Sequence, residues 1–303
     1  MQPSYHIPVL LAEVIEGLSI KPNGVYVDCT FGGGGHARAI LDKLGPSGRL
    51  VAFDQDSDAK ANLPADDRIV FVPENFRYLQ RFLRLHGLLP IDGLLADLGV
   101  SSHQFDEASR GFSTRFDAAL DMRMDQRLSK TAFWVVDTYE ESRLHKIFEQ
   151  YGEVTNAKTL AKTIVAARGT QSLRTIDGFK QAIRESVKGN PNKYFAQVFQ
   201  ALRMEVNDEL DALKELLTQL PMVIKPGGRV AIISFHSLED RMVKTFFKEG
   251  TLEQKQDHPF LSTPSSSPWK LVTKKPVVAG AEELKKNPRA RSAKLRVAQK
   301  TDQ

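Results

Sequence analysis

The 303 residues of the chain, 41% of them hydrophobic and 26% charged, have the composition of a globular protein and exclude a disordered one. A single cysteine, Cys29, excludes an internal disulfide and a cysteine-rich zinc site, and it fits a reducing cytoplasm. The net charge of +5 is uneven, because residues 241–303 hold 14 lysines and arginines against six acidic residues, which suggests a polyanionic partner or a solvated tail.

The first residues, MQPSYHIPVLLAEVIEGL, predict an amphipathic helix. Glu13 and Glu16 interrupt the apolar run and no basic segment precedes it, so the pattern is not that of a signal peptide. The sequence also has no apolar stretch of membrane-spanning length. We therefore expect no membrane partner and a cytoplasmic location.

Residues 24–100 alternate strand-like and helix-like stretches, a βαβ pattern that predicts a mainly parallel sheet of the Rossmann-like α/β class. Four short apolar runs are the expected strands: Val25–Asp28, Arg49–Asp54, Ile69–Pro73 and Asp92–Asp97.

The pattern changes after Gly99, where strand-like runs give way to helical ones. A polar, loop-like segment comes first, and residues 157–167 and 178–187 then have helical spacing. We expect an inserted helical domain over residues 102–207, which divides the sheet domain into residues 1–101 and 208–303.

Sheet-like sequence resumes after the insertion. Asn207 or Asp208 is expected to cap a leucine-rich helix that ends near Pro221. The segment KPGGRVAIISF then predicts a tight turn and a fifth strand, Arg229–Phe235, beside the fourth.

The remaining residues predict a loop and an edge of the sheet. Residues 251–268 are rich in serine and proline and are expected to form a loop. Residues 269–278 and 293–298 are strand-like and could add an antiparallel edge.

Four glycines, Gly32 to Gly35, lie between the first strand and a helix that is expected to begin near His36. Glycine is needed in such a loop because a Cβ would block the turn or keep the backbone away from a ligand. The next strand ends at Asp54, a position that suits a carboxylate bound to both ribose hydroxyls of a nucleoside. The two features together indicate a cofactor that contains adenosine.

The cofactor is either a dinucleotide or S-adenosylmethionine, since Gly32, Gly34 and Ala37 also satisfy the dinucleotide pattern G-x-G-x-x-A. Asp28 favours S-adenosylmethionine, because a carboxylate there repels a pyrophosphate and can pair with the methionine ammonium. The alternative is a structural glycine turn beside a surface aspartate.

Two other residues follow strands three and four. Phe76 could stack on adenine, although a core aromatic is the more common role for a phenylalanine. Asp97 ends the fourth strand, where ligands of open α/β sheets bind, and it faces either the methionine group or the substrate.

Several long blocks of the sequence are similar to motifs of one family: DCTFGGGGHARAIL, LLADLGVSSHQFDEASRGFS, LDMRMD, FQALRMEVNDEL, KPGGRVAIISFHSLEDRMVK and NPRARSAKLRVA. They resemble the bacterial 16S ribosomal RNA cytosine-N4 methyltransferases, the RsmH or MraW family. The resemblance runs from His6 to Ala298 and implies a class I methyltransferase domain with an inserted helical substrate-recognition domain.

The resemblance also implies the cofactor, the reaction and the partner. Cofactor contacts carry over to a set of matching positions: Gly34, Gly35, His36, Asp54, Asp97, Gln104 and, on a weaker local match, Phe76. The implied reaction is transfer of a methyl group from S-adenosylmethionine to the exocyclic amine of a cytidine in the decoding region. The implied partner is 16S rRNA or the small ribosomal subunit.

Methyl transfer to this amine is an in-line displacement that needs positioning and local electrostatics and requires no metal. A nearby hydrogen-bond acceptor would localise the N4 lone pair and take up a proton. The candidates follow strands four and five: Asp97, Ser101, Ser102, His236 and Asp240. The alternative for His236 is that it caps a helix and has no catalytic role. Cys29 is expected to be a core residue, which disfavours cytosine-C5 chemistry through a covalent thiolate.

Five arginines are candidates for phosphate contacts, and each could instead be an ordinary surface charge: Arg110, Arg115, Arg123, Arg289 and Arg291. Three other functions remain open at this point. One is a ribose 2′-O or other RNA methyltransferase on the same fold, one is a non-catalytic RNA-binding ribosome-assembly protein, and one is an NAD-linked dehydrogenase.

Overall fold

A computed structural model describes residues 8–253 and 267–302 of the chain. The chain divides into two compact units, which are described separately below. Unit 1 comprises residues 1–99 and 210–303, and unit 2 comprises residues 100–209.

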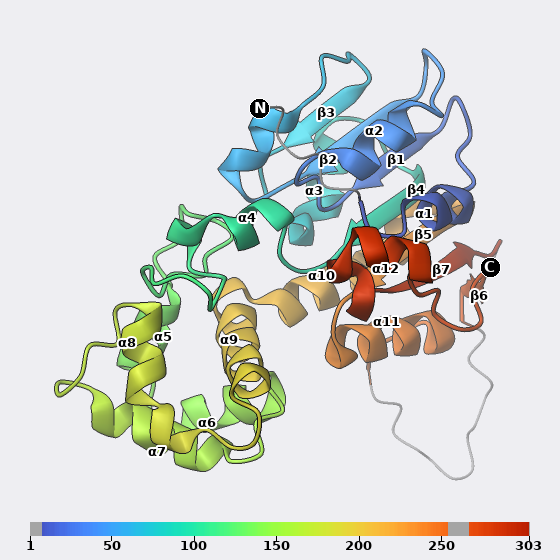
Figure 1. Cartoon of the computed structure of the whole chain (residues 1–303). Helices are drawn as coiled ribbons and strands as arrows, with labels where there is room; N and C mark the ends of the chain where they lie inside the picture. The colour runs from blue at the N-terminus through green and yellow to red at the C-terminus, as the bar shows by residue number, and fades with distance from the viewer. Residues whose placement is uncertain (1–7, 254–266, 303) are drawn as a thin grey trace, which may run out of the picture. The chain divides into compact units, whose positions relative to one another are not determined.

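Unit 1 is built on a seven-stranded sheet (Figure 1). Its strands are β1 (Val25–Asp28), β2 (Arg49–Phe53), β3 (Ile69–Val72), β4 (Ile91–Asp97), β5 (Ile224–Ser234), β6 (Trp269–Leu271) and β7 (Lys294–Lys300). The order is β3-β2-β1-β4-β5-β7-β6, with the first five strands parallel and β7 antiparallel to both neighbours. This order confirms the predicted Rossmann-like, mainly parallel fold and its antiparallel edge. It also places a topological switch point between β1 and β4, where open α/β sheets bind ligands.

Helices bury both faces of the sheet. The α-helices of unit 1 are α1 (Leu11–Leu18), α2 (Gly35–Leu41), α3 (Leu79–Leu85), α10 (Glu209–Val223), α11 (Ser237–Glu249) and α12 (Ala281–Lys286). The first residue of α10 is counted with unit 2. Unit 1 also contains three 3-10 helices: η1 (Ser57–Asn62), η2 (Phe76–Tyr78) and η5 (Pro288–Ser292). Adjacent strand residues point to opposite faces, so Val27 packs with α3, α10 and α11 whereas Tyr26 packs with α1 and α2. Burial on both sides explains why these strands are continuous apolar runs. Cys29 lies in this core, as predicted.

Unit 2 is helical. It contains α4 (Ser102–Asp106), α5 (Ala132–Thr138), α6 (Glu141–Gln150), α7 (Ala157–Ala167), α8 (Ile176–Ala182) and α9 (Pro191–Asn207), with η3 (Ala108–Arg110) and η4 (Arg184–Ser186). These helices surround their own hydrophobic core, which includes Phe148, Leu160, Phe179 and Leu202. The helix predicted over residues 157–167 is confirmed at both ends as α7.

The helix expected after Asn207 or Asp208 is α10, which begins at Glu209. Asp208 directly precedes it and is the left-handed residue that ends α9, with φ 49°. The Asn207 side chain is buried inside unit 2, where it donates to Met122 O and accepts from Met124 N. These long-range partners outweigh the local preference of asparagine for a helix N-terminus.

Helix α10 ends at Val223, near Pro221 as expected. The start of the strand that follows differs from the sequence-based one. Strand β5 begins at Ile224 instead of Arg229, because the expected turn is an irregularity within the strand, at which Gly227 has φ +75° and the register to β4 shifts. The predicted serine- and proline-rich loop at 251–268 lies mostly outside the described residues.

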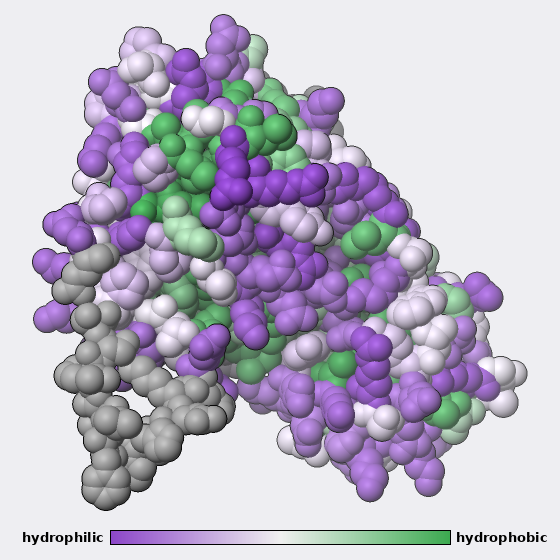
Figure 2. Space-filling view, turned by 180° about the vertical axis from the view of Figure 1, so that it is seen from behind, coloured by the Kyte–Doolittle hydropathy of each residue, from purple (hydrophilic) through white to green (hydrophobic). Residues whose placement is uncertain are grey.

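The outer surface is predominantly polar. Figure 2 shows hydrophilic residues over most of one face of the molecule, with apolar residues in groups between them. Within residues 8–253 and 267–302, none of the helices combines the length and apolar character needed to cross a bilayer.

Candidate active site

Three of the carboxylates singled out in the sequence lie at the same edge of the sheet in unit 1. Asp28 is the last residue of β1, Asp97 is the last residue of β4, and Asp54 directly follows β2. These strands are adjacent and parallel, so their carboxyl ends come together at the switch point of the sheet.

The glycine loop after β1 is shaped by contacts that exclude larger residues. Gly34 precedes α2 with φ +73°, and a Cβ there would lie 2.8 Å from Phe31 Cζ. A Cβ on Gly35 would lie 2.2 Å from Pro8 Cγ, whereas one on Gly33 would meet nothing within 4 Å. Packing against Phe31 and Pro8 thus requires glycine at positions 34 and 35, and the approach of a ligand to this backbone stays a prediction.

Asp54 anchors this loop. Its carboxylate accepts hydrogen bonds from Gly32 N at 2.7 Å and from Asp56 N at 2.8 Å. Asn62 donates to Gly32 O at 3.0 Å from the other side. Asp54 is thus fixed in orientation beside the loop, and its binding of ribose hydroxyls stays a prediction.

We expect the substitution Asp54→Ala to weaken the binding of S-adenosylmethionine by roughly 1.5–3 kcal/mol, because it removes charge-assisted hydrogen bonds. Isothermal titration calorimetry on the folded variant measures this loss, with the exposed Asp67→Ala as the matched control. An unchanged affinity in a folded Asp54→Ala protein would contradict the assignment of Asp54 to the ribose.

Asp28 and Asp97 are acidic groups in a buried setting. Asp28 is 1% exposed, and its Oδ1 accepts from Thr30 N at 3.0 Å. Thr30 Oγ1 also accepts from Asp97 N at 2.7 Å and thereby joins the two strand ends. Within the described residues, the buried atoms Asp28 Oδ2 and Asp97 Oδ1 have no hydrogen-bond partner. Two carboxylate oxygens are therefore buried without a hydrogen bond to offset the loss of water.

This setting changes the acidity of both groups. Burial raises the pKa of Asp28 to about 7, and the charge of Asp54 adds to this effect while the hydrogen bonds of Thr30 oppose it. Burial also raises the pKa of Asp97 to about 8, with added repulsion from the charges of Asp28 and Glu239. A cation placed between these carboxylates would restore their charged forms.

His36 does not supply that cation. It lies in the first turn of α2, with Nε2 3.0 Å from Val9 O and Nδ1 3.8 Å from Asp97 Oδ2. Burial lowers the pKa of His36 to about 4, so the ring is neutral near pH 7 and its Nε2–H donates to the Val9 carbonyl. His36 therefore does not balance the charges of Asp28 and Asp97 near pH 7.

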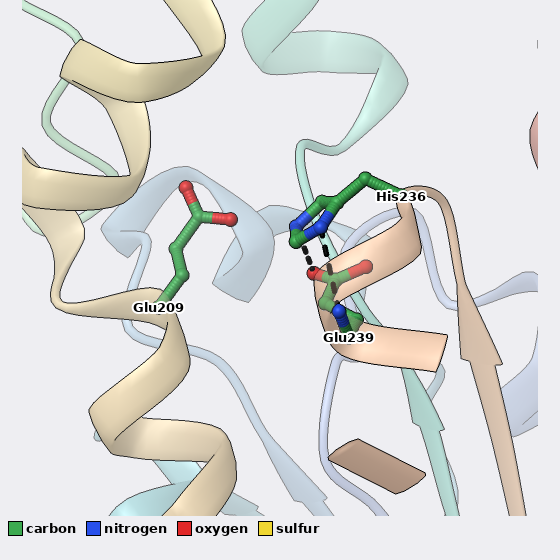
Figure 3. A group of neighbouring side chains, drawn as sticks. All are labelled: Glu209, His236 and Glu239. Atoms are coloured by element: carbon green, nitrogen blue, oxygen red, sulfur yellow. Dashed lines mark hydrogen bonds and ion pairs between the residues drawn. The ribbon is translucent and has the colours of Figure 1, made fainter. Parts of the chain in front are cut away.

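At the end of β5, His236 and Glu239 form a closed pair (Figure 3). Glu239 N donates to His236 Nδ1 at 3.4 Å, and the Glu239 carboxylate lies 3.0 Å from His236 Nε2 and accepts from Phe235 N at 2.9 Å. Both side chains are buried, at 7% and 3% exposure. This geometry favours the helix-capping alternative for His236, and its catalytic role stays a prediction.

Glu209, also drawn in Figure 3, is the last residue of unit 2 and pairs with Arg203 at 2.8 Å.

Glu239 was not among the residues predicted from the sequence. A signal for it was present, because Glu239 lies three residues after the helix cap His236, which is the spacing of a capping box. Asp240, which was predicted, instead joins α11 to β7 through Arg296 at 2.6 Å and Lys294 at 3.5 Å. Burial alone would raise the pKa of Asp240, but the hydrogen bond and charge of Arg296 outweigh burial and hold this pKa below its usual range. Its geometry is that of a structural ion pair.

Three predicted residues belong to unit 2. Ser101 caps α4 by accepting from Gln104 N at 3.1 Å, and the Gln104 side chain accepts from Ser101 N at 3.0 Å. Ser102 is the first residue of this helix and is half-buried. Their contacts within unit 2 explain how the DLGVSSHQ segment folds, and their roles toward cofactor and substrate stay predictions. Phe76 is half-buried in η2 against the core of unit 1.

The candidate arginines differ in exposure. Arg110 is 7% exposed and donates to the carbonyls of Arg123 and Met124, so its guanidinium is used inside unit 2 and is not presented to a phosphate. Arg123 makes a two-pronged ion pair with Asp121 at 2.7 Å. Burial of Arg110 was not evident from its sequence context, because its partners are backbone carbonyls more than ten residues away.

The other three arginines are nearer the surface. Arg115 is 62% exposed and lies 5.4 Å over the ring of Phe105. Arg289 is half-buried and Arg291 is exposed, both in η5. Among the five, Arg115 and Arg291 have the exposure that a phosphate contact needs.

Comparison with known proteins gives close relatives. The MraW methylase family matches residues 3–301. "Ribosomal RNA small subunit methyltransferase H" of Flavobacterium johnsoniae is 53% identical, over 98% of this chain and 98% of the relative. The protein of the same name from Bacteroides thetaiotaomicron is 52% identical, with the same coverage.

Among solved structures, an rRNA methylase from Streptococcus thermophilus is similar with a TM-score of 0.42 and 11% identity, over 98% of this chain and 99% of that chain. The assignment to a family rests on the sequence match, which spans nearly all of both units. The chain belongs to the MraW methylase family.

Proposed function

We propose that this protein transfers a methyl group from S-adenosylmethionine to N4 of a cytidine in the decoding region of 16S rRNA. The observation that carries the proposal is a pair of carboxylates beside the glycine loop, buried Asp28 and half-buried Asp97. Within the described residues, each has one buried oxygen without a hydrogen-bond partner. S-adenosylmethionine carries an ammonium and a sulfonium, whereas NAD would bring an anionic pyrophosphate toward the same carboxylates. The relatives named as small-subunit rRNA methyltransferases support the RNA substrate.

The residues of the site fit this cofactor. The glycine loop would approach its adenosine, Asp54 would hold the ribose hydroxyls, and Asp28 would pair with the ammonium. Asp97 would face the sulfonium and the incoming amine. When bound, the cofactor supplies an electrophilic methyl group.

The chain contributes positioning and proton uptake. Asp97 would accept a hydrogen bond from the cytosine N4–H and thereby orient the N4 lone pair for attack, while the cofactor would supply the methyl group. The methylated nitrogen would then have to lose a proton to an acceptor. Asp97 suits this step, because its proton affinity rises when the neighbouring sulfonium charge disappears.

Unit 2 is proposed as the RNA-recognition part of the enzyme, with free 16S rRNA or the small subunit as the partner, in the cytoplasm. The target cytosine must leave its stack, because a stacked base keeps N4 too far from the methyl group for in-line attack.

Nucleoside mass spectrometry of rRNA treated with the protein tests the proposal. We expect one methyl group gained on cytosine, with a fragment that places it on the base, and a much slower gain with the Asp97→Asn variant. A methyl group on the ribose would instead identify a ribose methyltransferase. No methylation of either free rRNA or small subunits would favour an RNA-binding assembly protein, and calorimetric binding of NAD would favour a dehydrogenase.

A further inference from the structure

A groove of about 810 Å³ lies within unit 2, where α7 faces α8 and η4. Hydroxyl, amide and charged groups make up most of its lining: Thr159, Lys162, Thr163, Thr170, Gln171, Gln181, Arg184 and Glu185, with Ala166, Ala167 and Ala182 between them. All of these lining residues belong to unit 2, whereas the strand ends of the candidate cofactor site belong to unit 1.

One face of α7 supplies much of this lining. Thr159, Lys162 and Ala166 recur at helical spacing on that face, whereas Leu160 and Ile164 point into the core of unit 2. The polar face of this amphipathic helix therefore forms one wall of a groove instead of a convex surface open to solvent.

The segment around the groove is strongly basic. Residues 156–193 contain eight lysines and arginines and two acidic residues, whereas the rest of unit 2 contains eight basic and 13 acidic residues. Lys162 and Arg184 are both exposed, and neither forms an ion pair within the described part of the chain. The excess positive charge of unit 2 thus lies in this segment, of which Lys162 and Arg184 line the groove beside one carboxylate, that of Glu185.

The kind of polyanion follows from the other lining groups. Among the described residues that line the groove there is no aromatic side chain, so it offers no platform for stacking bases. Thr170 Oγ1 donates its proton to Ala167 O at 3.0 Å. The hydroxyl oxygen can therefore only accept a hydrogen bond from a ligand in the groove. Such an acceptor suits the 2′-hydroxyl of a ribose, whereas the two cations suit phosphates.

We propose that this groove binds the sugar–phosphate backbone of RNA, with Lys162 and Arg184 on phosphates and Thr170 on a ribose 2′-hydroxyl. The inference deepens the proposed function, on which its RNA ligand rests. It assigns to the groove a positioning role that is independent of base sequence, because the groups in it read phosphate and sugar.

Fluorescence anisotropy with a short labelled oligouridine and the full chain tests this proposal. We expect the double variant Lys162→Ala/Arg184→Ala to bind more weakly, and the slope of log affinity against log salt to fall by about 1.4, since single strands lose about 0.7 per phosphate contact. The matched control Lys146→Ala/Arg84→Ala removes two exposed cations outside the groove and should leave the slope unchanged. Thr170→Val should reduce the preference for oligouridine over the equivalent DNA.

The variants must keep the thermal unfolding midpoint and the S-adenosylmethionine affinity of the unaltered chain. Unchanged oligouridine affinity and salt slope in the folded double variant would overturn the groove assignment, even if the unaltered chain methylates rRNA. Conversely, a reduced slope supports the groove even if mass spectrometry shows no methylated cytosine, so failure of the groove and failure of the proposed function are distinguishable.

Discussion

Replacing Asp97 by asparagine is expected to lower kcat/KM for rRNA methylation by about a hundredfold or more, which corresponds to about 2.7 kcal/mol of transition-state stabilisation. The amide has the shape of the carboxyl group, but it carries no charge to face the sulfonium and cannot take up the N4 proton. Transfer of a radiolabelled methyl group under single-turnover conditions measures the chemical step, and calorimetry measures cofactor binding.

Asp67→Asn, which changes an exposed aspartate of unit 1, is the matched control and should retain full activity. If Asp97→Asn methylated RNA at the normal rate, Asp97 would be neither the acceptor nor the partner of the sulfonium. A loss confined to cofactor affinity would restrict Asp97 to the methionine group.

The second large effect is a dependence of cofactor affinity on pH. The pKa of about 7 for Asp28 and of about 8 for Asp97 means that both groups are largely protonated in the cofactor-free protein below pH 7. A bound cation favours their charged forms, so binding must release protons. We expect the Kd for S-adenosylmethionine to rise as pH falls below about 8, where Asp97 protonates, and more steeply below about 7, where Asp28 protonates as well. The rise is about tenfold per pH unit for each proton released.

Calorimetry in buffers of different ionisation enthalpy counts these protons. S-adenosylhomocysteine lacks the sulfonium charge and should release fewer protons than S-adenosylmethionine, and Asp97→Asn should reduce the number for S-adenosylmethionine. Proton release that is zero, or equal for the two ligands, would show that the charged forms of Asp28 and Asp97 are not what the sulfonium recognises.

The sequence was most informative for the sheet of unit 1. Buried parallel strands are continuous apolar runs, and each strand that mattered for the site ended at an aspartate before a turn. Topology then brings Asp28 and Asp97 together, so their shared location could be predicted. The raised pKa values of these two carboxyl groups could not be predicted, because they depend on burial by residues that are distant in the sequence.

Partners far along the chain also explain why the roles expected for two residues do not fit the structure. Asp240 looked like a catalytic acceptor until Arg296, 56 residues away, was seen to pair with it. Asn207 looked like a helix cap, but two of its hydrogen-bond partners, Met122 and Met124, lie more than 80 residues earlier. A sequence pattern indicates which charges and amides are present, whereas the tertiary structure determines which of them are already used.

The position of β7 has a consequence for biosynthesis. This strand comprises Lys294–Lys300, close to the end of the chain, yet it lies between β5 and β6 inside the sheet and pairs with six residues of β5. Until the ribosome has made it, β5 remains an open edge whose unpaired amides and carbonyls can template wrong pairing. Residues 100–209 are complete well before that moment and surround a core of their own. An enzyme proposed to modify ribosomes therefore completes its own sheet only when β7, which follows the other six strands of the sheet in the chain, has been made.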